Sequence, residues 1–342
     1  MPERGEPLRK LGFLTIGRFD EADPGPGHQQ TLSMIERAEA LGFDSVWLRC
    51  RHLQPGISSP VAIMAAASQR TSRIDLGTAV IPLGLENPLR LAEDLATVDI
   101  LSGGRINPGV SVGTPMLYDH YKAKLYPETH ELEDFSKDRV VRLLECLRGD
   151  PVSDFEGKIG IEDFTRRVQP HSPGLADRVW YGGGMSSAIW AGRQGINYMT
   201  SSVVSIEGTD SRDFATIQGE NIDAFGPTTP IRSGPGSRKA LSSSPRTPLL
   251  VPRSRSTAHT RRGASNAHRR RRGRAACCSP PTTVGTSDEL ADVLCAHAGF
   301  QRADEVAFAL PFTFVEEDYL QIVTDMAEKL GPKLGWTPAV SA

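Results

Sequence analysis

The chain has 342 residues, which is long enough for one large α/β barrel or for two ordinary domains. Its formal net charge of −2 conceals two different parts. Residues 227–283 carry twelve Arg, one Lys and eight Pro with no Asp or Glu, so the rest of the chain carries a formal charge of −15.

Several classes of protein are excluded by what the sequence lacks. The amino end has no long apolar run of the kind found in export signals, and no stretch reaches the roughly 18 apolar residues of a membrane span. The five cysteines include no CxxC pair, which argues against a disulfide framework and against a zinc site. We therefore expect a soluble cytoplasmic protein with reduced thiols and without a metal.

The first third of the chain alternates between strand and helix patterns. Residues 10–17 (KLGFLTIG) form a short apolar run that predicts a buried strand, and residues 31–43 repeat apolar side chains at helical spacing. The same alternation continues through strands at 44–48, 73–82 and 105–113 and through helices at 59–71 and 87–104. Four strand–helix units in succession indicate a parallel sheet with helices outside it.

The middle and the end of the chain continue this alternation less regularly. Residues 134–149 predict an amphipathic helix, and residues 150–172 predict an excursion with short strands. Strand, Gly-rich turn, helix and strand follow over residues 178–202, then a helix over 211–226. After residue 283, a capped helix, a buried strand (305–312) and a closing helix complete the pattern. The predicted fold is a (β/α)8 TIM-type barrel that is disrupted around its seventh strand.

We divide the chain into three parts on this basis. Residues 1–226 hold the first six strand–helix units, and residues 284–342 hold the closing helix–strand–helix. Residues 227–283 contain PLLV as the one candidate for the missing strand. Their Arg, Pro and Ser content predicts either a disordered segment or the product of a shifted reading frame. A nucleic-acid-binding arm is the alternative of another class, although no aromatic residues are interleaved with the arginines.

Two turns at the carboxyl ends of predicted strands have the composition of a binding site. In YGGGMSSAIWAG, Gly183 and Gly184 precede a helix whose first turn holds Met185, Ser186 and Ser187, so bare amides and hydroxyls would form a phosphate site. In LGTAVIPL, the small residues Thr78 and Ala79 would let a flat ring approach the backbone. Asp99 and Arg105 flank a Gly-Gly turn, and we expect them to form a structural pair.

In their order, LGFDSVWL, RTSRIDLGTAVIPL, NPLRLAEDLATVDILSGGR and GGGMSSAIWAG resemble the luciferase-like flavin-dependent monooxygenase family. The resemblance covers residues 11–225 and 284–334 and implies a barrel that binds reduced FMN or, in one branch, a deazaflavin. It implies phosphate contacts at Gly183, Gly184 and Ser187, and a cis peptide bond between Ala79 and Val80 behind the flavin ring. It also implies that Ser111 and Gly113 lie beside the ring.

The resemblance is weaker for the catalytic residues. Where bacterial luciferases have an acidic residue and two histidines after the second strand, this chain has Cys50, Arg51 and His52. Light emission is therefore not implied. His52 is the best candidate for acid–base chemistry because imidazole titrates near neutral pH. Arg51 and His120 are further catalytic candidates, since both follow predicted strands.

These residues lead to a functional hypothesis with one close alternative. The first hypothesis is a monooxygenase that uses reduced FMN and oxygen on a small organic substrate, with a separate flavin reductase as partner and with homo-oligomerisation left open. The alternative is a deazaflavin-dependent hydride transferase on the same barrel. A non-catalytic flavin-binding protein is a third hypothesis, which would retain cofactor without turnover.

Overall fold

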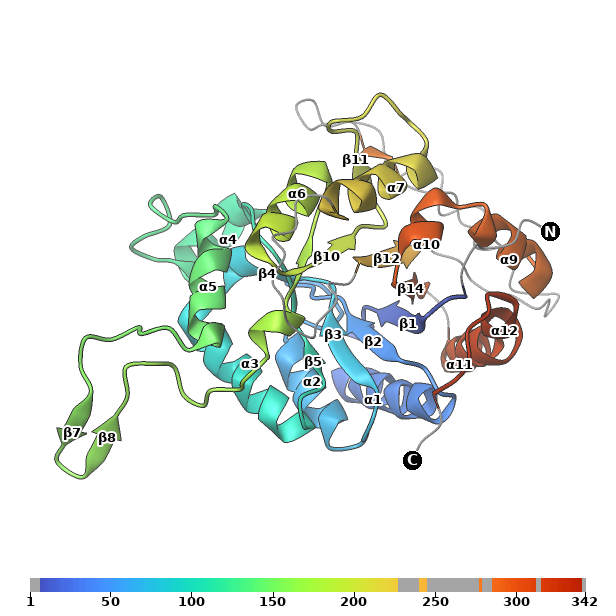
Figure 1. The fold of residues 1–342 in the computed structure, drawn as a ribbon. Coiled ribbons are helices and arrows are strands. Elements are labelled where there is room, and N and C mark those ends of the chain that lie inside the picture. The colour runs from blue at the N-terminus through green and yellow to red at the C-terminus, as the bar shows by residue number, and fades with distance from the viewer. Residues whose placement is uncertain (1–6, 227–239, 245–276, 279–284, 312–314, 340–342) are drawn as a thin grey trace.

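The computed structural model describes residues 7–226, 240–244, 277–278, 285–311 and 315–339, which form a ring of parallel strands with helices outside it (Figure 1). The ring is one sheet in the order β4-β6-β9-β10-β12-β14-β1-β2-β3-β5. Its strands are β1 (Lys10–Thr15), β2 (Ser45–Leu48), β3 (Asp75–Thr78), β4 (Ile81–Pro82), β5 (Ile106–Asn107), β6 (Gly109–Ser111), β9 (Trp180–Gly182), β10 (Asn197–Thr200), β12 (Ala240–Ser244) and β14 (Glu305–Ala309).

The two ends of this sheet meet, so the sheet is a closed barrel. Strands β3 and β4 are two halves of one strand that is interrupted at Ala79 and Val80, and β5 and β6 are two halves of the next, interrupted at Pro108. The first halves, β3 and β5, pair with each other, and so do the second halves, β4 and β6. The (β/α)8 barrel predicted from the sequence is therefore confirmed, and closure leaves the described strands of the barrel sheet without a free edge.

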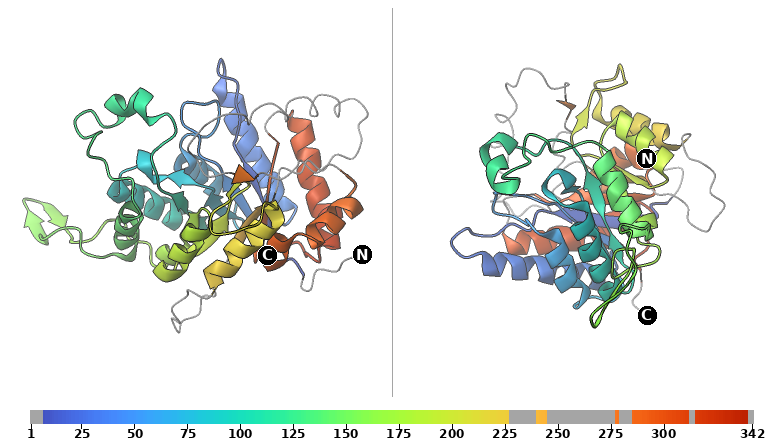
Figure 2. Two further views of the ribbon diagram at one scale, coloured as in Figure 1. Left: turned by 90° about the horizontal axis from the view of Figure 1, so that it is seen from above. Right: turned by 90° about the vertical axis from the view of Figure 1, so that its left-hand side faces the viewer.

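The helices pack around the strands in chain order (Figures 1 and 2). They are α1 (Pro24–Ala40), α2 (Pro60–Ser68), α3 (Pro88–Ser102), α5 (Asp138–Arg148), α6 (Met185–Gln194), α7 (Phe214–Phe225), α9 (Ser287–Cys295), α10 (Ala298–Arg302), α11 (Glu316–Asp325) and α12 (Gly331–Lys333), with a π-helical turn at Met326–Leu330 and 3-10 turns at Leu83–Leu85 and Ala176–Arg178. The predicted cap of α9 is present as a capping box between Thr286 and Glu289.

The seventh barrel position differs from the sequence-based expectation. Strand β12 pairs in parallel with β10 on one side and with β14 on the other. The segment is ALSSS, whose three serines gave no strand signal. The candidate strand PLLV lies outside the described residues, as do most of residues 227–283, so the predicted character of that segment stays a prediction. The short strand β13 (Cys277–Cys278) pairs antiparallel with β11 (Val204–Ser205).

Two segments depart from the barrel. The predicted excursion contains a hairpin of β7 (Gly157–Ile159) and β8 (Glu162–Phe164) that stands away from the helices (Figures 1 and 2). Helix α4 (Tyr118–Leu125) was not predicted, because its lysines and tyrosines show no apolar stripe. It lies in the long connection after β6.

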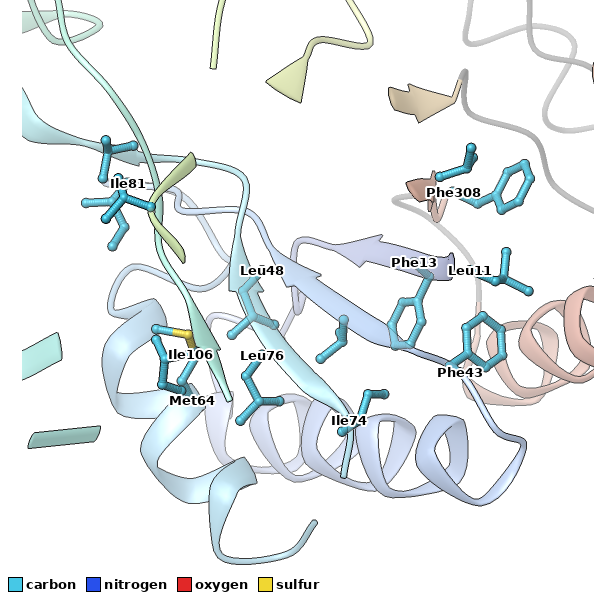
Figure 3. Packing of buried hydrophobic residues seen from close by; sticks show 14 of the residues in the cluster. Leu11, Phe13, Phe43, Leu48, Met64, Ile74, Leu76, Ile81, Ile106 and Phe308 are labelled. Carbon is cyan, nitrogen blue, oxygen red and sulfur yellow. The ribbon is translucent and has the colours of Figure 1, made fainter. Parts of the chain in front are cut away.

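Apolar side chains form one core outside the strands and a second inside the barrel. The outer core fills the space between the first strands and helices α1 and α2, where Phe13 and Phe43 meet edge to face at 5.7 Å (Figure 3). Inside the barrel, Trp47 and Trp180 also meet edge to face, with ring centroids 5.4 Å apart. Gly77 is needed beside them, since a Cβ there would lie 2.5 Å from the Trp47 ring.

Asp99 and Arg105 do not pair with each other, which corrects the sequence-based expectation. Asp99 is fully buried and pairs with Arg178, whose Nη2 lies 2.7 Å from Oδ2. Arg105 instead donates to the backbone carbonyls of Ser68 and Ile74, among others. Both residues hold helix ends against strands, so their role is structural.

Glu305 is a buried carboxyl group near the amino-terminal end of the barrel. Its Oε1 accepts hydrogen bonds from the Ser45 hydroxyl and from Trp47 Nε1, the latter at 2.9 Å. Burial raises the pKa of this carboxyl group, and the nearby charge of Lys10 opposes the shift. The folded chain therefore retains the proton at pH values where the unfolded chain releases it.

This shift predicts how Glu305→Gln changes the pH dependence of stability. The raised pKa makes wild-type stability fall as pH rises above about 4.5, the ordinary pKa of the group, whereas glutamine does not titrate. The free energy of unfolding of the wild type, relative to Glu305→Gln, should therefore decline with rising pH in urea titrations. The exposed Glu317→Gln serves as the control. Parallel pH profiles for wild type and Glu305→Gln would contradict the assignment.

Candidate functional site

A cavity of about 560 Å³ opens at the carboxyl ends of the barrel strands. This is the end at which barrel enzymes carry their active sites. The residues that line it come from the break between β3 and β4, from the ends of β1, β2, β6, β9, β10 and β14, and from the loops that follow. They include Leu14, Trp47, Arg49, Cys50, Arg51, His52, Leu53, Ala79, Val80, Ser111, Met116, Leu117, Tyr121, Gly182, Gly183, Gly184, Met199, Thr200, Ser201, Ser202, Ser205 and Ala307.

The break between β3 and β4 forms one wall. The Ala79–Val80 peptide bond is cis, as the resemblance implies, and both residues line the cavity. Ser111 lines it from the end of the neighbouring strand. Thr78 does not: it is fully buried, and its hydroxyl donates to the Gly109 carbonyl at 2.8 Å. Thr78 therefore joins neighbouring strands beneath the wall.

The amino terminus of α6 forms another side of the cavity. Gly183 and Gly184 line it, and Gly184 is the N-cap of the helix without a side chain to cap it. The backbone amides of Met185 and Ser186 lie in the first turn, where no intrahelical acceptor exists. These amides and the helix dipole make this end suited to an anion.

Ser187 stands next to these glycines although its side chain does not line the cavity. A Cβ on Gly183 would lie 2.3 Å from Ser187 Oγ, so the hydroxyl occupies the space beside the glycine backbone. The side chains of Met185 and Ser186 also do not line the cavity, and Ser186 is exposed. Met185 and Ser186 therefore adjoin the cavity through the backbone of the first helical turn, whereas the Ser187 hydroxyl lies beside Gly183, which lines the cavity.

Two charged side chains of opposite sign lie near the α6 terminus. Lys137 Nζ is 3.5 Å from the Ser186 carbonyl oxygen and 5.3 Å from the centre of the Trp190 ring. Burial lowers the pKa of Lys137, and the charge of Glu207 opposes that shift. A Cβ on Gly184 would lie 3.6 Å from Glu207 Oε2, so this carboxylate is beside the helix terminus.

Cys50 and His52 form a hydrogen-bonded pair in the part of the cavity that follows β2. Cys50 Sγ lies 3.2 Å from His52 Nε2 and 3.4 Å from the Ser58 carbonyl oxygen. Burial raises the pKa of Cys50 to about 12, with a further contribution from Glu86, and burial lowers the pKa of His52. Both groups are therefore neutral near pH 7. When the single thiol proton points to Ser58, Nε2 of His52 donates to sulfur and Nδ1 can accept a proton.

The remaining predicted residues divide between the cavity and the surface. Arg51 lines the cavity, whereas His120 is exposed on α4 and does not line it. Gly113 is exposed and also lies outside the lining. Sequence reasoning missed the hydroxyl groups of Thr200, Ser201 and Ser202, although a polar run directly after a buried strand was the signal that could have found them.

The profile of the luciferase-like monooxygenase family matches residues 10–209, more than half of the chain. The chain belongs to this family. The resemblance drawn from its motifs is therefore confirmed. In the described part of the chain, no group of His, Cys, Asp or Glu side chains could hold a metal ion, and no helix is long and apolar enough to span a membrane.

Curated relatives of the chain differ in the activities that their names give. An F420-dependent glucose-6-phosphate dehydrogenase of Amycolatopsis mediterranei is 28% identical over 190 residues, 53% of this chain and 56% of that protein. The 4-hydroxyprotoasukamycin monooxygenase of Streptomyces nodosus is 32% identical over 151 residues, 43% of this chain and 40% of that protein. The chain thus spans only about half the length of these relatives or less.

Solved structures extend the likeness in fold to nearly the whole chain. The oxygenating constituent of 3,6-diketocamphane monooxygenase from Pseudomonas putida, in complex with FMN, has a TM-score of 0.65 at 12% identity. The match covers 95% of this chain and 98% of that chain. At this identity the likeness shows the shared barrel.

Gly183→Ala tests the packing at the start of α6. The new Cβ would meet Ser187 Oγ at 2.3 Å and its Cβ at 2.6 Å, so the first helical turn must shift. We expect a loss of about 1–3 kcal/mol in the free energy of unfolding, measured in urea. Gly226→Ala is the control, because its Cβ would have no neighbour within 4 Å. Equal stability of both variants would contradict this packing.

The Cys50 thiol should be unreactive in the folded chain. Its pKa of about 12 and its burial leave little thiolate at neutral pH and restrict access for a reagent. Iodoacetamide followed by peptide mass spectrometry should find Cys50 unmodified in the native chain and alkylated in urea. Equal rates in the two states would show that the thiol is ionised or accessible.

Proposed function

We propose that this chain is a flavin-dependent oxidoreductase that binds reduced FMN in the barrel cavity and acts as a monooxygenase on a small organic substrate. The observation that supports this most is the shape of the cavity, in which the cis Ala79–Val80 wall and the open terminus of α6 belong to one space. A flat ring and an attached phosphate need these two surfaces together.

The residues present fit such a cofactor. The phosphate would be held by the amides of the first turn of α6 beside Gly183 and Gly184, with Ser187 as a hydroxyl donor. The ring would lie against Ala79 and Val80, with Ser111 at its edge. Reduced flavin, when bound, supplies the electrons for oxygen chemistry.

The chain itself would orient the substrate, exclude water and move a proton. Leu14, Trp47 and Met199 make part of the cavity apolar. His52 is the candidate proton acceptor, since burial lowers its pKa and leaves the ring neutral near pH 7. The Cys50 sulfur fixes the orientation of this ring by accepting a hydrogen bond from His52 Nε2, which leaves Nδ1 to accept the proton.

A deazaflavin-dependent hydride transferase is the second candidate. It is favoured by the relatives with F420-dependent activity, which match this chain with an identity similar to that of the monooxygenases.

The proposal further includes a separate flavin reductase, a cytoplasmic location and self-association into a homo-oligomer. DNA or RNA binding by residues 227–283 concerns a segment that lies almost wholly outside the described residues.

Equilibrium titration of the purified chain with reduced FMN and with reduced deazaflavin tests the proposal. Ser187→Ala removes a hydroxyl donor to a charged oxygen and should weaken FMN binding by roughly tenfold. Glu207→Gln removes a negative charge near the same helix terminus and should strengthen binding.

The outcomes separate the candidates. Preference for the deazaflavin by about tenfold or more would reverse the order of the two enzymes. FMN binding that is unaffected by both substitutions would move the phosphate away from α6. Retention of cofactor without any turnover of oxygen would support the non-catalytic hypothesis.

A further inference from the structure

Arg51 is a cationic side chain in the cavity for which the described residues offer no anionic partner. Arg49 and Arg51 both line the cavity, and its described lining includes no Asp or Glu. The Arg51 backbone amide is bound to the Ile57 carbonyl oxygen at 2.7 Å, which fixes the start of the side chain. Burial lowers the pKa of the Arg51 guanidinium. A negative charge on Cys50 would raise it.

The neighbouring groups do not neutralise Arg51. The Cys50 thiol and the His52 imidazole are uncharged near pH 7. Glu86 is close enough to raise the pKa of Cys50, but it does not line the cavity and does not shift the pKa of Arg51. Burial raises the pKa of Glu86 itself. A half-buried positive charge without a partner is costly, so an anionic guest would be stabilised there.

The position of Arg51 separates it from the phosphate end of the cavity. Arg51 follows β2 and α6 follows β9, and the strands that carry Ala79, Val80 and Ser111 lie between β2 and β9 in the barrel. A cofactor phosphate at α6 would therefore leave Arg51 on the other side of the ring. The same cavity has apolar walls, because Leu53, Met116 and Leu117 line it with largely exposed side chains, and Leu53 is two residues from Arg51 in the chain.

We propose that Arg51 binds the carboxylate of an amphipathic organic acid, whose apolar part lies against Leu53, Met116 and Leu117. The substrate class of the enzyme is then small organic acids, an assignment that rests on the function proposed above. A guanidinium matches a carboxylate with two parallel hydrogen bonds, which a neutral amide or alcohol cannot reproduce with the same strength.

The test compares two probes that differ in charge but not in shape, 4-phenylbutyrate and 4-phenylbutyramide. Their binding is measured by calorimetry, with and without FMN, on the full chain as wild type, Arg51→Gln and Arg51→Lys. The exposed Arg193→Gln, at the far end of α6, is the matched control. FMN affinity is measured separately for each variant.

We expect the wild type and Arg193→Gln to prefer the carboxylate by roughly tenfold or more. Arg51→Gln should lose the preference, and Arg51→Lys should retain part of it because lysine keeps the charge but not the planar geometry. FMN affinity should stay the same in all variants. If Arg51→Gln does not fold, the comparison uses Arg51→Lys, whose preference for the carboxylate over the amide should be smaller than that of the wild type.

Three results would overturn the proposal: no carboxylate preference in the wild type, an unchanged carboxylate preference in the Arg51 variants, or weaker FMN binding in the Arg51 variants in place of a lost carboxylate preference. The last result would assign Arg51 to the cofactor. Failure of the proposed function is distinguishable, because it appears as absent FMN binding while the carboxylate preference of the cofactor-free chain persists.

Discussion

The position of the Trp47 indole inside the barrel is the constraint on which the rest of the site depends. Its Nε1 donates to Glu305 at 2.9 Å, and its ring meets Trp180 edge to face. Only glycine fits at position 77 beside it. A buried aromatic ring whose one hydrogen-bond donor is satisfied has a fixed position. Trp47 packs with the apolar side chains inside the barrel and also lines the cavity at the carboxyl ends of the strands, so it forms the floor of that cavity.

The cavity above Trp47 has two polar regions separated by an apolar wall. One region is the uncapped start of α6, which favours an anion through backbone amides and the helix dipole. The other holds Arg51 with the neutral pair of Cys50 and His52. Each region uses a different physical source of positive potential, and the cis Ala79–Val80 wall lies between the strands that carry them.

Local patterns in the sequence predicted the barrel, while contacts between distant residues could not be predicted. Apolar periodicity was sufficient for most strands and helices, and the predicted cap of α9 is present, formed by Thr286 and Glu289. The partner of Asp99 could not be read, because Arg178 is 79 positions away and reaches it only in the folded chain. Likewise, loop position suggested that His120 faces the cavity, whereas the unpredicted helix α4 leaves it exposed.

We propose that one cavity holds a flavin with its phosphate at α6 and its ring at Ala79–Val80. A crystal structure of the chain with FMN measures this most directly. We expect the phosphate oxygens within hydrogen-bonding distance of the first-turn amides of α6, and the ring against the cis peptide bond. A phosphate bound at Arg51, or a flavin outside the barrel cavity, would contradict it.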